Sequence, residues 1–261
     1  MSQNYLGRID LSEKEWEDSK WTDLLKERYH IASLFTAGKV VLDSCCGTGF
    51  GAINFIVPEA SFTVGIDLCD SAAHHYGKSP KYDFKVMDGR GLDLAADTFD
   101  VVLSLDAIEH FEQADGLQYL AQIRRVCKQD GTIIGTTPLV IDPCLIPDYL
   151  EWNKFHFCMY TKEILQQTLA RIFPAVKIYE IYSGVCPYFL FVCNKSEQAS
   201  ASWHEQKVIE YLNENKEIFC KSKISNLLLW ARMLLGKGML FKAGYLTLKA
   251  CLLKPRLARC R

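Results

Sequence analysis

Short runs of β-branched and apolar residues alternate with helical segments along most of this chain, and this alternation constrains its fold more than any other feature. Five runs have the length and composition of buried strands: residues 39–43, 61–66, 82–87, 99–105 and 132–137. Segments with helical spacing precede or separate them, over 21–35, 50–57, 72–76 and 114–128. Because parallel strands need crossover connections, this order predicts a doubly wound, Rossmann-like α/β sheet with helices on both faces.

The end of the sheet is expected to differ from its beginning. A helix over 161–172, with Thr161 as its N-cap, leads into two further strands at 176–182 and 187–193. Only a short turn around Ser183-Gly184 separates these strands, so they should form an antiparallel hairpin. The sequence therefore predicts a mainly parallel, seven-stranded sheet with an antiparallel last strand.

Composition divides the chain into three parts. We expect an N-terminal helical segment over 1–38, a sheet domain over 39–194 and a helical extension over 203–261. Within the sheet domain, residues 138–160 are expected to form an irregular lid, because they begin with three prolines in ten residues. Asp130-Gly131 is expected to turn the chain into the fifth strand.

The eleven cysteines indicate a reducing compartment. They form no Cys-x-x-Cys pair, and several lie inside apolar runs, as core residues would. The first twenty residues lack the apolar centre of a signal peptide, and no uncharged apolar run reaches the roughly 18 residues of a spanning helix. These features predict a cytoplasmic protein with buried thiols and without a zinc site.

Charge is distributed unevenly along the chain. The formal net charge is −1, but residues 221–261 hold ten Lys and Arg and no acidic residue. Residues 1–220 therefore hold 20 basic and 31 acidic residues, a net formal charge of −11. An acidic body is a poor surface for nucleic acid, so we expect no nucleic-acid partner there.

Acidic residues close the first three expected strands. The first strand runs through Asp43 into a loop with Gly47 and Gly49, which allow a close backbone approach to a ligand. Asp67 ends the second strand and Asp88 follows the third. Ligands of such sheets bind at the carboxyl ends of the strands, so these carboxylates should share one site. Together they suit a nucleoside, with one acid for the ribose hydroxyls and one for an adenine amine.

Two classes of nucleoside ligand compete for this site. The spacing Gly47-x-Gly49-x-x-Ala52 with Asp67 also fits a loose dinucleotide pattern, which would make the protein a nicotinamide-dependent oxidoreductase. Asp43 stands at the loop entry, however, and a carboxylate there would repel a pyrophosphate. It would instead attract a cation such as the ammonium of S-adenosylmethionine. A purely structural interpretation, with Asp43 as a loop cap and the glycines as turn residues, is the third alternative.

The motifs resemble those of class I S-adenosylmethionine-dependent methyltransferases. The resemblance rests on residues 40–51 (VVLDSCCGTGFG), 64–67 (VGID), 87–89 (MDG) and 99–110 (FDVVLSLDAIEH). Thr136-Thr137-Pro138 and the segments around Arg28 and His156 are similar to a subgroup that includes ubiquinone-type and glycan-biosynthesis methyltransferases. The resemblance covers roughly residues 20–195. It implies methyl transfer from S-adenosylmethionine, which leaves S-adenosylhomocysteine, and it does not identify the acceptor.

The resemblance assigns cofactor contacts to residues that follow the expected strands. The implied contacts are Arg28 with the methionine carboxylate, Asp43 with the ammonium, Leu105 in the methionine pocket, Cys45, Gly47 and Gly49 near the ligand, Asp67 with the ribose, Leu68 and Gly89 beside the adenine, Asp88 with its amine, and His110 at the mouth. Arg28 has an alternative as a surface arginine. Cys45 departs from the family, which has Gly or Ala there, and narrows the methionine pocket.

Methyl transfer to a hydroxyl requires orientation of the acceptor and removal of its proton. Glu109, His110 and His156 are the candidate catalytic residues, because they lie at the mouth of the site or in the lid. Glu109 and His110 alone are two ligands, too few for a convincing metal site, so no metal is expected. Trp152, His156 and Tyr160 of the aromatic lid are candidate acceptor contacts, with packing of the lid as the alternative for each.

The basic extension has two interpretations. Its apolar and cationic residues are typical of a peripheral anchor on an anionic membrane, or of a helical hairpin whose cations meet the acidic body. We expect an enzyme that methylates, at oxygen, a small molecule or a sugar or glycan precursor. The alternative is an inactive, methyltransferase-fold binding protein recruited to a membrane by residues 221–261.

Overall fold

The computed structural model describes residues 20–70, 79–182, 186–197, 202–236, 239, 242–243, 246–247 and 249–250. The helix expected over 72–76, the turn at Ser183-Gly184 and much of the basic extension lie outside these residues.

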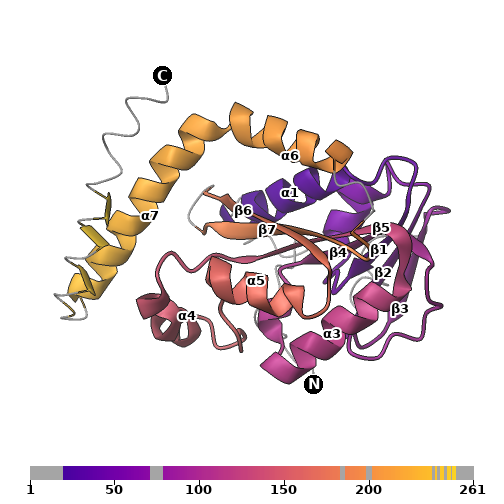
Figure 1. Cartoon of the computed structure of the whole chain (residues 1–261), viewed down its shortest axis with the longest axis horizontal. Helices are drawn as coiled ribbons and strands as arrows, with labels where there is room; N and C mark the ends of the chain where they lie inside the picture. The colour runs from indigo at the N-terminus through magenta and orange to yellow at the C-terminus, as the bar shows by residue number, and fades with distance from the viewer. Residues whose placement is uncertain are drawn as a thin grey trace.

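A seven-stranded sheet forms the centre of the protein (Figure 1), in the order β3-β2-β1-β4-β5-β7-β6. The strands are β1 (Val40–Ser44), β2 (Phe62–Asp67), β3 (Tyr82–Val86), β4 (Phe99–Leu105), β5 (Cys127–Pro138), β6 (Ala175–Ile181) and β7 (Tyr188–Asn194). Neighbouring strands from β3 to β5 are parallel, and β7 pairs antiparallel with both β5 and β6. The expected fold is confirmed, although the antiparallel last strand lies inside the sheet and β6 forms the edge.

Helices cover both faces of the sheet (Figure 1). The helices of the protein are α1 (Lys20–Ser33), α3 (Gln113–Val126), α4 (Ile146–Trp152), α5 (Lys162–Ala170), α6 (Ser202–Glu214) and α7 (Lys216–Gly236), with a π-helical turn η2 (Ala52–Ile56) and 3-10 turns η3 (Ile108–His110) and η4 (Pro143–Leu145). Helices α1 and α6 share one face, where Tyr211 of α6 donates to Glu27 of α1 at 2.7 Å, and α3 and α5 cover the other. Thr161 Oγ1 accepts from Ile164 N at 3.3 Å, which confirms the expected N-cap of α5.

The core lies between the central strands and these helices. Val101, Val102 and Leu103 of β4 and Ile133 and Ile134 of β5 are at most 1% exposed. Burial of each such side chain contributes roughly 1.5–3 kcal/mol, so the middle of the sheet is a rigid base for the loops at its carboxyl end.

Two local predictions are wrong. Asp130-Gly131 does not form a turn before the fifth strand, because both residues lie inside β5, which starts at Cys127. The β4–β5 register jumps from Phe99↔Cys127 to Val101↔Thr132. The extra residues are absorbed in an irregularity of the strand, which lets β5 begin earlier than its apolar run.

The lid is also less irregular than expected, because it contains η4 and α4. Pro143 and Pro147 lie in the first turns of these helices, where a missing N–H removes no helical hydrogen bond. Asp142 caps η4 by accepting from Cys144 N at 3.1 Å. Two of the three prolines that suggested a loop, Pro143 and Pro147, therefore start helices, and Pro138 ends β5.

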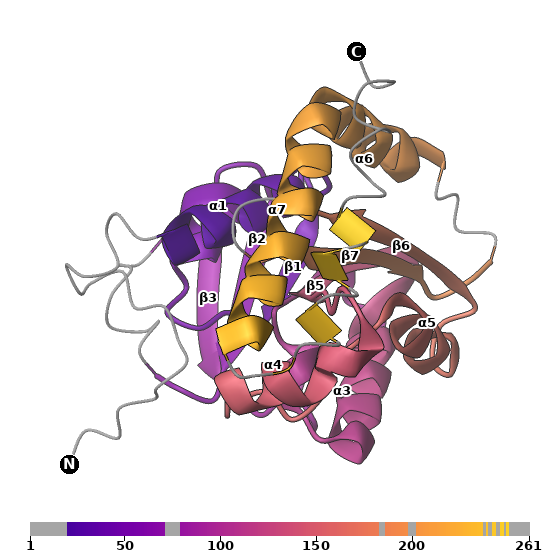
Figure 2. The same cartoon turned by 90° about the vertical axis from the view of Figure 1, so that its left-hand side faces the viewer.

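The helical extension packs on the lid (Figure 2). Leu227, Trp230 and Leu234 of α7 form a buried cluster with Leu145 and Tyr149, and the Tyr149 and Trp230 rings stack at 4.4 Å.

Lysines of the extension pair with acids of the body. Lys249 Nζ lies 2.6 Å from Asp142, Lys242 Nζ 3.4 Å from Asp148, and Lys223 Nζ 3.4 Å from Glu180. This agrees with the hairpin interpretation of the extension. No helix among the described residues is both long and apolar enough to cross a membrane.

We expect Gly135→Ala to destabilise the sheet by about 1–3 kcal/mol, because an added Cβ would overlap the buried ring of Phe191 on β7. Gly91→Ala is the matched control, since an added Cβ there has no heavy atom within 4 Å. Thermal and urea unfolding of both variants measure the difference. Equal stability of the two would contradict the packing described here.

Candidate active site

The loop after β1 depends on left-handed backbone. Cys45, Gly47 and Gly49 have φ of 60°, 59° and 76°, a region that favours glycine. Cys45 adopts it without being glycine, and burial raises the pKa of its thiol to about 12. The side chain is therefore a neutral, half-buried thiol and not a reactive thiolate.

Asp67 ties this loop to β2. Its Oδ2 accepts from Gly47 N at 2.8 Å and its Oδ1 accepts from Cys69 N at 3.0 Å. The carboxylate is 5% exposed, whereas the next side chain, Leu68, is 58% exposed. An acid and an exposed apolar side chain thus lie together at the end of β2, and the end of this strand at Asp67 is as the sequence predicts.

Asp43 is a buried carboxylate with one unsatisfied oxygen. Tyr29 donates its hydroxyl to Oδ2 at 2.9 Å, while Oδ1 is buried without a hydrogen-bond partner. Burial raises the pKa of Asp43 to about 7, against the lowering effect of the Tyr29 hydrogen bond. A cation bound beside Oδ1 would supply the missing partner.

Asp88 is held by a neighbouring arginine. The Arg90 guanidinium contacts both carboxylate oxygens at 2.7–3.1 Å and holds the pKa of Asp88 below its usual range. An adenine amine would therefore share this carboxylate with Arg90. Gly89 beside it is buried, and a Cβ there would approach the Tyr119 ring to 2.8 Å.

Arg28 lies inside the protein, which excludes the surface alternative. It is 5% exposed, its Nη1 lies 2.7 Å from Asp106 Oδ2, and its guanidinium lies 4.7 Å from the centre of the Tyr188 ring. The Asp106 charge helps to raise the pKa of Arg28, although burial opposes this. Leu105, the last residue of β4, is buried and immediately precedes Asp106 in the sequence.

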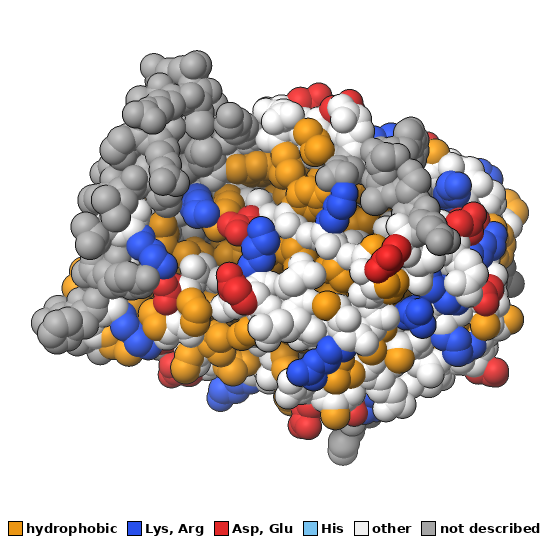
Figure 3. Space-filling model, viewed as in Figure 1, with side chains coloured by type: hydrophobic (Ala, Val, Ile, Leu, Met, Phe, Trp, Pro, Cys, Tyr) orange, Lys and Arg blue, Asp and Glu red, His pale blue; other side chains and the backbone are white. Residues whose placement is uncertain are grey.

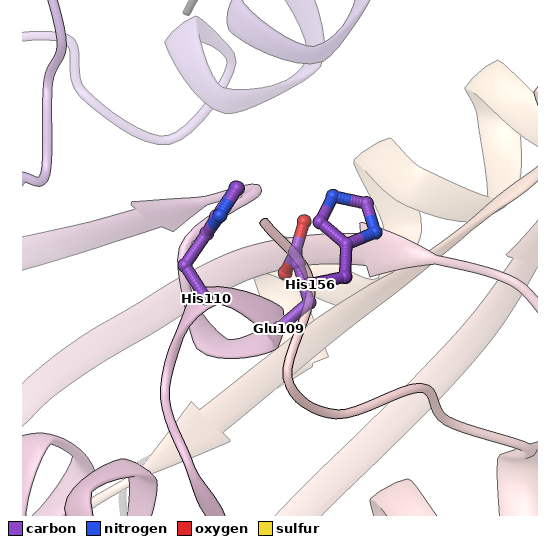
Figure 4. A group of neighbouring side chains, drawn as sticks. All are labelled: Glu109, His110 and His156. Atoms are coloured by element: carbon purple, nitrogen blue, oxygen red, sulfur yellow. The ribbon is translucent and has the colours of Figure 1, made fainter. Parts of the chain in front are cut away.

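Glu109, His110 and His156 form one cluster (Figure 4). Each offers a ligand atom, and the three atoms lie within 4.8 Å of one another. Figure 4 shows the Glu109 carboxylate between the two imidazole rings, whose centres are 4.9 Å apart. The η3 turn after β4 supplies Glu109 and His110, and the lid supplies His156.

The electrostatics of the cluster favour uncharged groups in its present form. Burial and the nearby Asp106 raise the pKa of Glu109 to about 8. Burial, His110 and Arg28 lower the pKa of His156 to about 4. His156 is therefore a neutral imidazole at pH 7.

Comparisons with known proteins agree with the fold. A family model described as a methyltransferase domain matches residues 41–131. Residues 41–131 are therefore a class I S-adenosylmethionine-dependent methyltransferase domain. The match runs from β1 into β5, the part of the sheet that carries most of the site.

Two of the curated relatives each match about half of this chain. One is a probable S-adenosylmethionine-dependent methyltransferase of Mycolicibacterium smegmatis, 28% identical over 47% of this chain and 47% of the relative. The other is a tRNA U34 carboxymethyltransferase of Aeromonas salmonicida, 33% identical over 49% of this chain and 39% of the relative. The matches span less than half the length of these relatives.

Solved structures support the fold. The N-methyltransferase NodS of Bradyrhizobium japonicum, in complex with S-adenosylhomocysteine, has a TM-score of 0.56 at 11% identity and covers 70% of this chain and 92% of that one. The 1,6-didemethyltoxoflavin-N1-methyltransferase of Burkholderia thailandensis has a TM-score of 0.53 at 18% identity, covering 70% and 82%.

The lid is fixed to η3 by main-chain contacts. Phe157 N and Cys158 N both donate to the Glu109 carbonyl, at 2.8 and 3.2 Å. His110 Nδ1 lies 3.0 Å from the Phe155 carbonyl, which can only accept, so this nitrogen is the donor. These contacts bring His156 to the end of β4.

The two aromatic candidates for acceptor contact lie in different surroundings. Tyr160 is 5% exposed and packs in the core. Trp152 is 54% exposed and lines a cavity of about 310 Å³ with Trp230 and Leu234 of α7. Contact with an acceptor stays a prediction for both.

Two partners in the site were missed by sequence reasoning. Asp106 holds Arg28, and Thr137 donates its hydroxyl to Glu109 Oε2 at 2.8 Å. The position of Asp106 could have indicated a site residue, because it directly follows the buried strand β4, much as Asp88 follows β3 after one residue. No local pattern distinguishes Thr137 from Thr132 or Thr136.

Proposed function

We propose that this protein transfers the methyl group of S-adenosylmethionine to an oxygen of a small molecule or of a sugar or glycan precursor. The observation that carries the proposal is the buried Asp43 Oδ1, which lacks a partner at the carboxyl end of β1. A ligand with an ammonium group satisfies it, whereas a pyrophosphate would be repelled. The adjacent Asp67 and exposed Leu68 then suit the ribose and adenine.

The proposed contacts follow the sheet from one end of the cofactor to the other. Asp43 faces the ammonium, and Arg28, which pairs with Asp106 directly after β4, receives the carboxylate. Leu105 lines the methionine pocket, and the glycine loop lies next to the ligand. Asp67 receives the ribose hydroxyls, and Leu68, Asp88 and Gly89 surround the adenine. Cys45 narrows the pocket with a small, neutral side chain, which is compatible with binding.

The chemistry requires a positioned acceptor more than a strong acid. The cofactor supplies an electrophilic methyl group on a sulfonium, whose departure as a neutral thioether needs no protonation. Glu109, His110 and His156 lie beyond the methionine end of the proposed site and orient the acceptor hydroxyl. The unprotonated ring nitrogens of His110 and His156 are the proposed acceptors of its proton.

The acceptor class follows from charge. One relative acts on tRNA, but residues 1–220 of this chain have a net formal charge of −11. On the face shown in Figure 3, basic and acidic side chains interleave and form no basic stripe. A small or sugar-containing acceptor fits this surface better than a polynucleotide. Membrane attachment is left out of the proposal, because the paired lysines of the extension face the body.

Calorimetric titration with S-adenosylmethionine, S-adenosylhomocysteine and NADH tests the cofactor. We expect binding of the first two alone, and Asp67→Ala to weaken S-adenosylhomocysteine binding about 10- to 100-fold through loss of charge-assisted hydrogen bonds. Asp93→Ala, an exposed acid after β3, is the control and should bind as the parent does. Unchanged affinity of Asp67→Ala would refute the assignment of this site.

Acceptors are then screened by transfer of a labelled methyl group. Nucleotide sugars and small hydroxylated aromatic compounds are the first set, and bulk tRNA is included as the opposing candidate. Labelling of tRNA alone would refute the proposed acceptor class while leaving the cofactor assignment in place.

A further inference from the structure

The Glu109 side chain has an oxygen without a partner inside a cluster of nitrogen ligands. Glu109 is 1% exposed, and Thr137 occupies its Oε2. Its Oε1 is buried and accepts no hydrogen bond. A buried carboxylate oxygen in this state is costly, and a cation bound beside it would remove the cost.

His110, a member of the same cluster, has a defined tautomer. Because its Nδ1 donates to the Phe155 carbonyl, Nε2 is the acceptor nitrogen of the ring. An imidazole whose other nitrogen donates to a carbonyl is the usual form of a histidine metal ligand, since the outer hydrogen bond fixes both tautomer and ring orientation.

His156 has a fixed tautomer as well. Asn153 Oδ1 accepts from Phe155 N at 3.0 Å, so the Asn153 amide nitrogen faces His156 and donates to Nε2 at 2.9 Å. His156 Nε2 is therefore an acceptor, and a metal ion at this nitrogen would displace the amide.

The surrounding charges leave a place for a cation. Arg28 is close enough to Glu109 for its charge to act on the carboxyl, but Asp106 pairs with Arg28 at 2.7 Å. Because the charges of Arg28 and Asp106 offset each other, the groups left to bind a cation are the carboxylate of Glu109 and the two imidazoles. This set of one carboxylate and two imidazoles favours a divalent transition-metal ion over Mg²⁺ or Ca²⁺, which prefer oxygen ligands.

We infer that Glu109, His110 and His156 bind a divalent transition-metal ion such as Zn²⁺, Mn²⁺ or Fe²⁺. Two ligands at about 2.1 Å from one ion lie at most about 4.2 Å apart. The ligand atoms here lie within 4.8 Å, so small side-chain rotations complete the site. The sequence shows only Glu109 and His110 as neighbours, and the lid adds the third ligand.

Such a site would also define the acceptor more closely, an extension that rests on the proposed methyl transfer. Three protein ligands leave coordination positions open, and an acceptor hydroxyl bound there would lose its proton to water more readily. The oxygen then forms a bond to the methyl carbon while the carbon–sulfur bond breaks, with its electron pair going to sulfur. The acceptor would be a hydroxyl compound, best with two neighbouring oxygens.

Titration of the full chain with Co²⁺ and Zn²⁺ tests the site. We expect one equivalent to bind, with visible absorption from Co²⁺ and weaker binding of Mg²⁺. His110→Ala and His156→Ala should each weaken Co²⁺ binding at least about tenfold. His30→Ala, an exposed histidine on α1, is the matched control and should bind as the parent does. Absence of binding, or equal binding by all variants, would overturn the site.

The same preparations separate this inference from the proposed function. S-adenosylhomocysteine binding is measured by calorimetry on each variant, which also reports folding. Retained S-adenosylhomocysteine binding without any metal binding overturns the metal site alone. Metal binding without S-adenosylhomocysteine binding supports the metal site and counts against the proposed function.

Discussion

Arg28→Met is expected to lower the free energy of unfolding by about 3 kcal/mol. The guanidinium is 5% exposed and pairs with Asp106 at 2.7 Å, and its removal leaves a partly buried carboxylate without a counter-charge. The charges of Arg28 and Asp106 both act on Glu109, so removal of the Arg28 charge leaves the repulsion between Asp106 and Glu109 without compensation. Urea unfolding at pH 7.5 measures the effect.

The controls separate charge from packing. Arg28→Met with Asp106→Asn removes both charges and should recover part of the lost stability, because the uncompensated charge causes most of the loss. Arg90→Met breaks an ion pair with Asp88 and Asp115 on the surface, and its stability should change little. A loss for Arg90→Met as large as that for Arg28→Met would contradict this account.

The Arg28 variants also test the role proposed for its charge. If Arg28 receives the carboxylate of the cofactor, Arg28→Lys should keep most of the stability and still bind S-adenosylhomocysteine more weakly, because lysine lacks the planar fork. If Arg28→Lys and the parent bind S-adenosylhomocysteine equally well, the role of Arg28 is restricted to its ion pair with Asp106.

The site at the strand ends could largely be predicted from the sequence. Parallel strands bring their carboxyl ends to one edge of the sheet, so the alternation of elements predicts that Asp43, Asp67 and Asp88 lie at that same edge. Their roles depend on contacts that no spacing encodes. The Arg90 guanidinium that covers Asp88 is one such contact.

The lid could be predicted only in part. Its prolines indicated an irregular loop, yet Pro143 and Pro147 start η4 and α4, since proline favours a helix start as well as a turn. The meeting of His156 with Glu109 depends on hydrogen bonds between the lid and the Glu109 carbonyl. These are main-chain contacts between distant segments, which side-chain patterns do not report.

The helical extension shows the limit of charge patterns. An excess of lysines fits a membrane surface and an acidic protein surface equally well. Asp142 and Asp148 of the lid supply partners for Lys249 and Lys242. Their nearness to the extension depends on the packing of α7 against α4, and that packing is a tertiary feature.

Asp43→Asn is expected to stabilise the protein at pH 8 and to weaken its binding of S-adenosylmethionine. The pKa of Asp43 is raised to about 7 from an ordinary value of 3.8, so the folded state holds a proton that the unfolded state releases. The group therefore favours folding fully below about pH 4, and this contribution is lost as the pH rises to 7. The total loss is on the order of 4 kcal/mol, and an amide in place of this carboxyl would not undergo it, because it does not titrate.

The measurement is the difference in unfolding free energy between parent and variant from pH 4 to pH 8. Other titrating groups are common to both proteins and cancel in this difference. The cost of burying an amide occurs only in the variant, shifts the difference by the same amount at every pH and does not change its pH dependence. The variant should gain relative to the parent up to pH 7 and then hold that gain. A difference that does not change with pH would contradict a raised pKa at Asp43.

The same substitution should weaken S-adenosylmethionine binding about tenfold or more at pH 8, because the ammonium loses a charge-assisted partner. Stability and affinity would then change in opposite directions at one residue. Such opposition is expected where a buried charge is retained for a ligand rather than for the fold. Asp43→Asn with higher stability and unchanged affinity would instead assign the carboxylate to the loop, where Tyr29 is its only hydrogen-bond partner among the described residues.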